Sequence, residues 1–304
     1  MESRNLGERA AMANSSLIQV RELVRLLAGP KAARPVLLDV RYRRGSPTGF
    51  QEFEDSHLPG ASYVDMDTEL ATIRPDGVGG RHPMPTVEAI ALAMRSAGVT
   101  MSRPVVAYDN WASLPASRVW WMLRHLAFLD VRVLDVGTAA WTAARRPVDS
   151  GSGTSGSGHF FPSIPGVGRL LNATEATRYA VGHLLLDARS ADRFRGENET
   201  IDAVAGHIPG AISAPALANV DADAHFLPAD ELTRCFHELG AADGETIGVL
   251  CGSGIHATHL ALALCVPGIS DFAEVYTAIW SVWFTDSTPP NPIQDGPRWG
   301  QVEC

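Results

Sequence analysis

The stretch Thr246-Ile-Gly-Val-Leu-Cys-Gly-Ser-Gly-Ile-His256 predicts a strand that ends at a thiol and a glycine-rich turn, and the apolar residues 257–264 predict a helix after it. Gly252 and Gly254 permit backbone conformations in which successive NH groups face one atom, here the Cys251 sulfur. Such a cradle at a helix start stabilises a thiolate. We therefore expect Cys251 to be a nucleophile with a lowered pKa; the plainer alternative is a buried cysteine beside an ordinary turn.

Two halves of the 304-residue chain repeat each other, which fits two domains of ordinary size. The recurring motifs are Leu37-Leu-Asp-Val-Arg41 with Leu185-Leu-Asp-Ala-Arg189, and His57-Leu-Pro-Gly-Ala61 with His207-Ile-Pro-Gly-Ala211. Val105-Val-Ala-Tyr-Asp109 aligns with the strand that leads into Cys251. The first half thus carries Asp109 where the second half carries the thiol. Asp39, Asp187, His57 and His207 recur in both halves, so we expect them to fix turns rather than to perform chemistry.

Each half alternates short apolar runs with helical stretches, such as a strand over 105–108 and a helix over 115–126. This alternation predicts an α/β fold, a parallel sheet flanked by helices, with ligands at the carboxyl ends of the strands. The Gly/Ser-rich segment 149–165 predicts a flexible linker. It separates an N-terminal domain over 17–148 from a C-terminal domain over 166–304, and residues 1–16 read as a disordered tail, with Met1 or Met12 as the start.

Composition excludes several classes of partner. The net charge of -9 and the presence of a single lysine, Lys31, argue against nucleic acid or an anionic membrane. No apolar run approaches about 18 residues and the N-terminus does not read as a signal peptide, so we expect a cytoplasmic protein. The four cysteines, at 235, 251, 265 and 304, have no Cys-x-x-Cys spacing and no metal-ligand pattern with histidine.

In their order and spacing, these motifs make the chain similar to the two-domain rhodanese family of sulfurtransferases, over about residues 17–283. Besides the repeats and the cysteine loop, the resemblance rests on Arg118-Val-Trp-Trp121, Asp187-Ala-Arg-Ser-Ala-Asp-Arg-Phe194 and Gly206-His-Ile-Pro-Gly210. It implies tandem rhodanese-like domains, of which the second is catalytic. The Cys251-Gly-Ser-Gly254 start resembles the 3-mercaptopyruvate sulfurtransferase branch, since thiosulfate-preferring rhodaneses carry basic residues after the cysteine.

The resemblance implies that Cys251 holds a persulfide and passes its outer sulfur to cyanide or to a thiol, such as thioredoxin or a small thiol. Backbone NH groups would stabilise the thiolate and the persulfide without a metal or organic cofactor, and they come from Gly252, Ser253, Gly254, Ile255 and His256. Arg193 matches the family's substrate-binding arginine and would bind the donor's carboxylate. The family's second arginine is missing, because the chain reads Arg195-Gly-Glu-Asn-Glu-Thr-Ile-Asp202 there, with Arg195 as a candidate substitute.

The resemblance also implies a proton relay of Ser253, His82 and Asp67, which match in order a set proposed for the 3-mercaptopyruvate branch. A histidine oriented by a carboxylate could hold the serine hydroxyl and protonate the enolate of departing pyruvate. Alternatives remain open: His82 could only rigidify its proline-flanked loop, and Asp65 could replace Asp67. His256 stands where the family carries threonine, and it could either lend positive charge to the thiolate or reshape donor access.

Three rival functions remain. A cysteine phosphatase needs an arginine six positions after the cysteine, but residue 257 is alanine. The intact cysteine loop argues against a non-enzymatic persulfide sensor or binding module. Thiosulfate is the rival donor; Gly252 and Ser253 offer it no cationic side chain, whereas the missing second arginine weakens the preference for 3-mercaptopyruvate.

Overall fold

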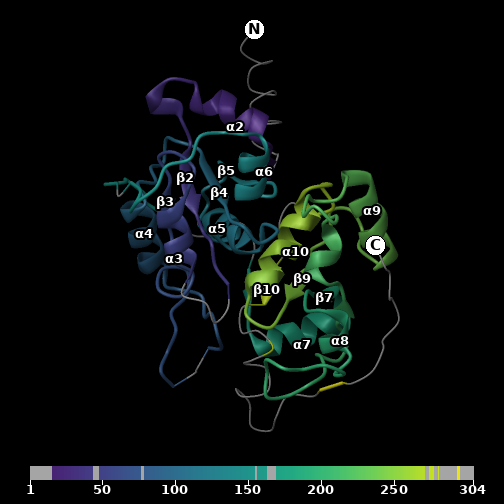
Figure 1. Ribbon diagram of the computed structural model, residues 1–304. Helices are drawn as coiled ribbons and strands as arrows, with labels where there is room; N and C mark the ends of the chain where they lie inside the picture. Colours follow the sequence, from purple (N-terminus) through teal and green to yellow (C-terminus); the bar gives the residue numbers. More distant parts are fainter. Residues whose placement is uncertain are drawn as a thin grey trace. The chain divides into compact units, whose positions relative to one another are not determined.

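The computed structural model describes residues 16–43, 48–76, 79–154, 156–162, 169–270, 274–276, 280 and 293–294. The chain divides into two compact units, coloured along the sequence in Figure 1: unit 1 contains residues 1–69 and 86–167, and unit 2 contains residues 70–85 and 168–304. Residues 70–85, which we assigned to the N-terminal domain, therefore group with the second unit. The predicted tail over residues 1–16 lies outside the described residues, except for Ser16.

Unit 1 is built on a parallel sheet whose described strands lie in the order β1-β5-β4-β2-β3. The strands are β1 (Leu17–Ile18), β2 (Val36–Asp39), β3 (Ser62–Tyr63), β4 (Val105–Tyr108) and β5 (Val131–Leu134). The helices are α2 (Val20–Leu27), η1 (Lys31–Ala33), α3 (Thr48–Asp55), α4 (Val87–Ser96), α5 (Leu114–His125) and α6 (Thr138–Ala143). The predicted strand over 105–108 is confirmed, and the predicted helix over 115–126 is α5, one residue earlier.

Unit 2 repeats this order as β6-β10-β9-β7-β8, again with parallel pairing. Its described strands are β6 (Leu170–Leu171), β7 (Leu185–Asp187), β8 (Ile212–Ser213), β9 (Gly248–Leu250) and β10 (Glu274–Tyr276). Its described helices are α7 (Ala173–Gly182), α8 (Ala191–Phe194), η2 (Ala216–Asn219), α9 (Ala229–Glu238) and α10 (Ile255–Cys265). The identical strand order confirms the internal repeat and the predicted α/β class.

Two of the described helices, α4 and α7, begin at a side chain that caps them. Thr86 precedes α4 and its hydroxyl accepts the NH of Ala89 at 3.2 Å. Before α7, Asn172 accepts the NH of Glu175 at 3.0 Å, and the Glu175 carboxylate accepts the NH of Asn172 at 2.9 Å. This reciprocal pair satisfies two donors that the first helical turn leaves unbonded. Among the helices of the described residues, none combines the length and the apolar character that a bilayer crossing needs.

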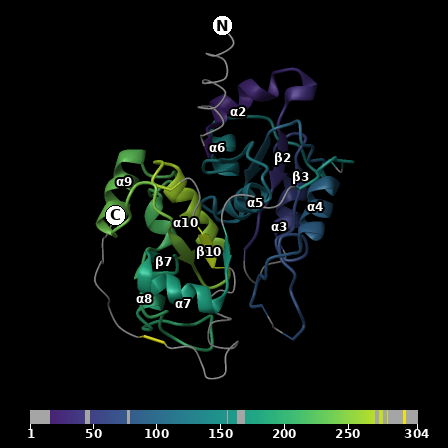
Figure 2. The same ribbon diagram turned by 180° about the vertical axis from the view of Figure 1, so that it is seen from behind.

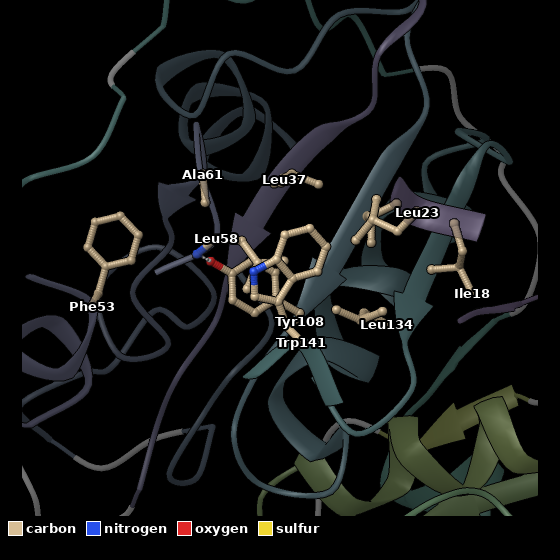
Figure 3. Close-up of a cluster of buried hydrophobic side chains, with 10 residues drawn as sticks. Ile18, Leu23, Leu37, Phe53, Leu58, Ala61, Tyr108, Leu134 and Trp141 are labelled. Carbon is tan, nitrogen blue, oxygen red and sulfur yellow. Dashed lines mark hydrogen bonds between the residues drawn. The ribbon is translucent and has the colours of Figure 1, made fainter. Parts of the chain in front are cut away.

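The core of unit 1 follows from strands that are buried on both faces. All four residues of β2 and of β4 are buried, as expected for the centre of a parallel sheet covered by helices. Figure 3 shows the apolar side chains of this unit gathered around Tyr108, whose hydroxyl accepts the NH of Leu58 at 3.2 Å. The helix α5, labelled in Figure 2, packs against β4 and β5, and its residues from Leu114 to Leu123 are all buried.

The strand order creates a reversal point between β7 and β9. From β7 the chain passes through α8 to β8 on one side of the sheet order, whereas from β9 it passes through α10 to β10 on the other. Because such crossovers are right-handed, α8 and α10 cover opposite faces of the sheet. Asp187 at the end of β7 pairs with Leu250 at the end of β9. Ligands of open α/β sheets bind at such a reversal point, and Cys251 is the first residue beyond it.

The repeated aspartate and histidine motifs have the same contacts in both units. Asp39 pairs with Arg41 and Asp187 with Arg189, with N–O distances of 2.8 and 2.7 Å between buried side chains. Each histidine ring stacks on a phenylalanine, and its Nδ1 lies 2.8 Å from that residue's carbonyl oxygen; the pairs are His57 with Phe53 and His207 with Phe194. These contacts agree with the expected role in fixing turns.

The described part of the Gly/Ser-rich segment pairs with unit 1. Bridges join Asp149 to His57, Gly156 to Ala97 and His159 to Thr100, and the Phe160 side chain is fully buried. A Cβ atom on Gly156 would lie 2.7 Å from the Cα atom of Gly98. Glycine is thus required here for close approach of two backbones, whereas we had explained the same composition by flexibility.

Candidate active site

Cys251 lies at the junction of β9 and α10, as predicted, and its side chain is fully buried. Its sulfur accepts backbone NH groups from Gly254 at 2.9 Å and from Ser253 at 3.4 Å. Gly254 has a φ of +84°, a left-handed conformation that costs other residues about 1–2 kcal/mol. The backbone of Cys251 is held as well, because its carbonyl accepts the NH of Trp280 at 3.0 Å. The cradle expected from the glycines is therefore formed.

The electrostatics of the thiol differ from our expectation. Burial raises the pKa of Cys251, and it outweighs the backbone NH groups of Ser253, Ala257 and Gly254, which lower it. The carboxylate of Asp187 raises the pKa further. The predicted lowering of the Cys251 pKa is therefore wrong for this structure. Burial destabilises the thiolate more than the backbone NH groups stabilise it. The thiol therefore keeps its proton at neutral pH.

Two arginines and an aspartate cover the loop directly beside the thiol, and all belong to unit 2. The Asp202 carboxylate binds both guanidinium groups: Oδ1 pairs with Arg81, and Oδ2 pairs with Arg193 at 2.7 Å. A Cβ atom on Gly252 would lie 2.5 Å from Nη2 of Arg81 and 3.4 Å from Nη2 of Arg193. Glycine at 252 therefore makes room for the guanidinium groups next to Cys251.

Arg81 is a residue that we did not single out in the sequence. It precedes His82 in Gly79-Gly-Arg-His-Pro-Met-Pro85, and that adjacency was the available signal. Positions 252 and 253 carry no cationic side chain, as the sequence shows, but Arg81 brings a guanidinium group beside Gly252 from a distant segment. Arg195, the candidate substitute for the second arginine, instead pairs with Glu197 at 2.7 Å. Arg81 is thus the second guanidinium at this site.

Arg193 also contacts Glu199, at 3.0 Å. One oxygen of Glu199 accepts the NH groups of Ile201 and Asp202 at 2.9 and 2.8 Å, which fixes the turn that presents Asp202. The two guanidinium charges of Arg81 and Arg193 are therefore matched by the two carboxylates of Glu199 and Asp202. The predicted donor-binding arginine is present beside the thiol, but its charge is already paired.

His256 stands on the first turn of α10 and remains partly exposed. Burial and the nearby charges of Arg193 and Arg81 together lower the pKa of its imidazole to about 4, against the opposing effect of Asp187. The imidazole is therefore neutral at pH 7. Of the two roles left open in the sequence, a positive charge beside the thiolate is not supported, and an effect on donor access remains.

The proposed relay residues fall in both units. Ser253 and His82 belong to unit 2, where Ser253 is partly exposed and His82 is buried. Asp67 belongs to unit 1 and its side chain is exposed. Its partial desolvation by neighbouring residues and the charge of Asp65 raise its carboxyl pKa. Asp65, the alternative, fixes a turn: its Oδ1 accepts the NH groups of Asp67 and Thr68 at 2.9 and 2.8 Å. The serine, histidine and aspartate relay stays a prediction.

The corresponding loop of unit 1 holds Asp109 at the end of β4. Its Oδ1 accepts the NH groups of Trp111 at 2.7 Å and Ser113 at 3.1 Å, and its Oδ2 accepts that of Ala116 at 2.8 Å. Burial raises the pKa of Asp109 to about 6, against the effect of these three donors. This loop therefore forms a cradle of the same kind around a carboxylate of its own.

Comparisons with known proteins agree with this geometry. The family model of the Rhodanese-like domain matches residues 19–144 and again residues 168–283. A Mycobacterium tuberculosis protein named "Putative thiosulfate sulfurtransferase SseB" is 37% identical over 277 residues, which cover 90% of this chain and 95% of that protein. A Pseudomonas aeruginosa protein named "Probable 3-mercaptopyruvate sulfurtransferase" is 36% identical over 291 residues, which cover 94% of this chain and 100% of that protein.

Among solved structures, the 3-mercaptopyruvate sulfurtransferase from Leishmania major superposes with a TM-score of 0.78 at 25% sequence identity. The match covers 91% of this chain and 76% of that one. The similarity therefore extends over both repeats, and the names of the relatives divide between two sulfur donors.

Proposed function

The chain belongs to the rhodanese family of sulfurtransferases, and we propose that this enzyme transfers the thiol sulfur of 3-mercaptopyruvate to Cys251, where it becomes the sulfane sulfur of a persulfide, and then passes it to a thiol or to cyanide. The observation that carries the proposal is the Cys251 sulfur at the end of β9, with the NH groups of Gly254 and Ser253 at 2.9 and 3.4 Å. These donors can stabilise a thiolate before transfer and a persulfide after it.

The first half-reaction begins when Cys251 loses its proton. The thiolate attacks the sulfur of the donor, an S–S bond forms, and the C–S bond breaks with its electron pair moving to carbon as the enolate of pyruvate. Protonation of that carbon releases pyruvate and leaves the persulfide on Cys251. In the second half-reaction, the acceptor attacks the outer sulfur and the S–S bond returns its electron pair to the Cys251 thiolate.

Ser253 and His82 are our candidates for the proton that the enolate needs, with Asp67 as the orienting carboxylate. Replacing His82 or Ser253 by alanine should slow turnover of mercaptopyruvate by roughly one hundred to ten thousand fold, the range for a lost general acid or base. Turnover of thiosulfate should fall less, because departing sulfite needs no protonation at carbon. Equal losses with both donors would point to damage of the loop itself.

The donor assignment rests on charge. Thiosulfate carries two negative charges, and the site offers it no surplus of positive charge, because Glu199 and Asp202 match Arg81 and Arg193. Mercaptopyruvate presents a single carboxylate, which two guanidinium groups can bind at lower desolvation cost. We therefore expect a preference of about ten to a hundred fold for mercaptopyruvate, which corresponds to one charge-assisted hydrogen bond of about 1.5–3 kcal/mol.

The test is kcat/KM for both donors at pH 8 with cyanide as acceptor. Higher kcat/KM for thiosulfate would remove the mercaptopyruvate assignment and keep the sulfurtransferase class. The thiol acceptor, thioredoxin or a small thiol, and the cytoplasmic location belong to the same proposal. Kinetics with each acceptor and fractionation of cells that produce the protein would test these two points.

A further inference from the structure

Two guanidinium groups that converge on one carboxylate form a carboxylate-binding site, and in unit 2 this site holds a carboxylate of the chain itself. Each oxygen of Asp202 binds a different arginine, Oδ1 to Arg81 and Oδ2 to Arg193. The Asp202 side chain is 2% exposed, whereas those of Arg81 and Arg193 are 22% and 14% exposed. Solvent therefore reaches the cations more readily than the carboxylate that pairs with them.

The cluster of Arg81, Arg193 and Asp202 lies next to the residue that follows Cys251. Gly252 is the residue after Cys251. A Cβ atom built on it would lie within 3.4 Å of Nη2 of Arg81, Nη2 of Arg193 and Oδ2 of Asp202. The charges of both arginines also act on His256, four residues after Gly252, where they help to lower its pKa. A donor whose sulfur meets Cys251 must bring its own negative group into this cluster.

We propose that Arg81 is a donor-binding residue and that Asp202 is a competing internal carboxylate, which the donor's carboxylate replaces on the arginines. The inference rests on the proposed function and extends it to a specificity determinant. Asp202 acts against anionic ligands in proportion to their charge, because Coulomb energy scales with the product of the charges. It therefore disfavours a doubly charged donor more than a singly charged one, which is selection by repulsion.

Alkylation of Cys251 tests the carboxylate site without requiring sulfur transfer. Iodoacetate carries a carboxylate and iodoacetamide is its neutral counterpart; each loses iodide as the thiolate sulfur forms a bond to carbon. The ratio of their rates at Cys251, followed by peptide mass spectrometry, reports how well the site receives a carboxylate. The neutral reagent corrects for changes in thiol pKa or accessibility.

Asp202→Asn keeps the side-chain shape and removes the charge, so the iodoacetate to iodoacetamide ratio should rise about tenfold. Arg81→Gln should lower it about tenfold. The matched control is Glu197→Gln, which removes the same charge from the same segment but from the partner of Arg195. That variant should stay within about twofold of the unmodified protein.

The double variant Asp202→Asn/Arg81→Gln distinguishes two explanations. Either the ligand's carboxylate replaces Asp202 on Arg81, or the charge of Asp202 acts on the ligand from a distance. If Asp202 competes for Arg81, the gain from Asp202→Asn should shrink to about threefold or less in the Arg81→Gln background, because coupled residues are not additive. An equal gain in both backgrounds, or no gain in either, would overturn the inference. The ratio measured in urea gives the value for an unfolded chain, and a gain above that value cannot come from misfolding, so the Asp202 variant stays informative even if the Arg81 variant is unstable.

Donor kinetics complete the test. In Asp202→Asn, KM should fall about tenfold for mercaptopyruvate and about a hundredfold for thiosulfate, so the preference between them narrows. If the alkylation ratio shifts as expected while neither donor supports transfer, the proposed function fails and the carboxylate site stands. If transfer proceeds and the ratio does not shift, the inference fails and the proposed function stands.

Discussion

In the first repeat, the carboxylate of Asp109 accepts three backbone NH groups, whereas in the second repeat the sulfur of Cys251 accepts two. Both groups follow the strand at the reversal point of their sheet, and both precede a long buried helix, α5 or α10. The cradle is therefore a property of the repeated fold. What differs is the atom that occupies it.

The difference leads us to expect sulfur transfer at only one loop. The two carboxylate oxygens of Asp109 accept the NH groups of Trp111, Ser113 and Ala116, and a carboxylate cannot form a persulfide. Cys251 presents one sulfur that can change its bonding. Burial raises the pKa of both groups despite the NH donors, to about 6 for Asp109. The fold thus provides orientation in both repeats, and chemistry depends on the single residue at the strand end.

Removing the sulfur should produce the largest effect. Cys251→Ala should abolish sulfur transfer, because no other group in the cradle can carry a persulfide. Intact-protein mass spectrometry after exposure to mercaptopyruvate should find one added sulfur in the unmodified protein and none in the variant. An adduct that persists and maps to Cys235, Cys265 or Cys304 would contradict the contrast between the two loops.

Distorting the cradle should have a smaller effect. Gly254→Ala introduces a side chain at a φ of +84° and displaces an NH donor, so kcat/KM should fall about ten to a hundred fold, the value of one hydrogen bond to a charged group. Gly240→Ala is the matched control, because Gly240 has a φ of +92° with open space around it, away from the site. Both variants should lose about 1–2 kcal/mol of stability. Equal losses of activity would assign the effect to stability alone.

Changing the silent loop should affect stability more than activity. Asp109→Asn should retain more than about a tenth of the sulfur transfer, a barrier change below about 1.4 kcal/mol. Because the pKa of Asp109 is raised to about 6, its contribution to stability is present below the ordinary pKa near 4 and is lost as the pH rises through 6. The unmodified protein should therefore lose about 3 kcal/mol relative to the variant between pH 4 and pH 7.

Urea unfolding at the two pH values measures this difference. The control is Asp130→Asn, which removes the same charge from an exposed position of the same unit. A difference between Asp109→Asn and the unmodified protein that stays constant from pH 4 to pH 7 would mean that Asp109 is not a strained buried acid.

The smallest expected effect concerns the backbone of the silent loop. Ser113 begins α5 at a φ of +62°, where the second repeat has Gly254. Ser113→Gly should relieve this strain and raise the unfolding free energy by up to about 1 kcal/mol, with no change in sulfur transfer. Ser117→Gly, the same substitution inside α5, should destabilise by about 1 kcal/mol. A Ser113 variant that is no more stable than Ser117→Gly would show that the two loops differ less than their dihedral angles indicate.

The sequence predicted the repeat, the strand over 105–108, the helix after Cys251 and the cradle, because these depend on local periodicity and on glycine. It did not predict the direction of the Cys251 pKa shift, since burial and the approach of Asp187 are tertiary properties. Arg81 was missed because it pairs with Asp202 across 121 positions of sequence and within a segment that we assigned to the other repeat. The described residues 149–160 also misled us, because glycine serves close packing there as well as flexibility.

The grouping of residues 70–85 with unit 2 has a consequence for the modularity of the duplicated gene. A protein encoded by the second repeat alone, from residue 168 onward, would contain Cys251, Arg193 and Asp202 but would lack Arg81 and His82. Asp202 would then face one arginine instead of two. A cut at residue 168 would therefore not separate the two compact units, because the stretch of coding sequence for Arg81 and His82 lies ahead of that cut while these residues group with unit 2.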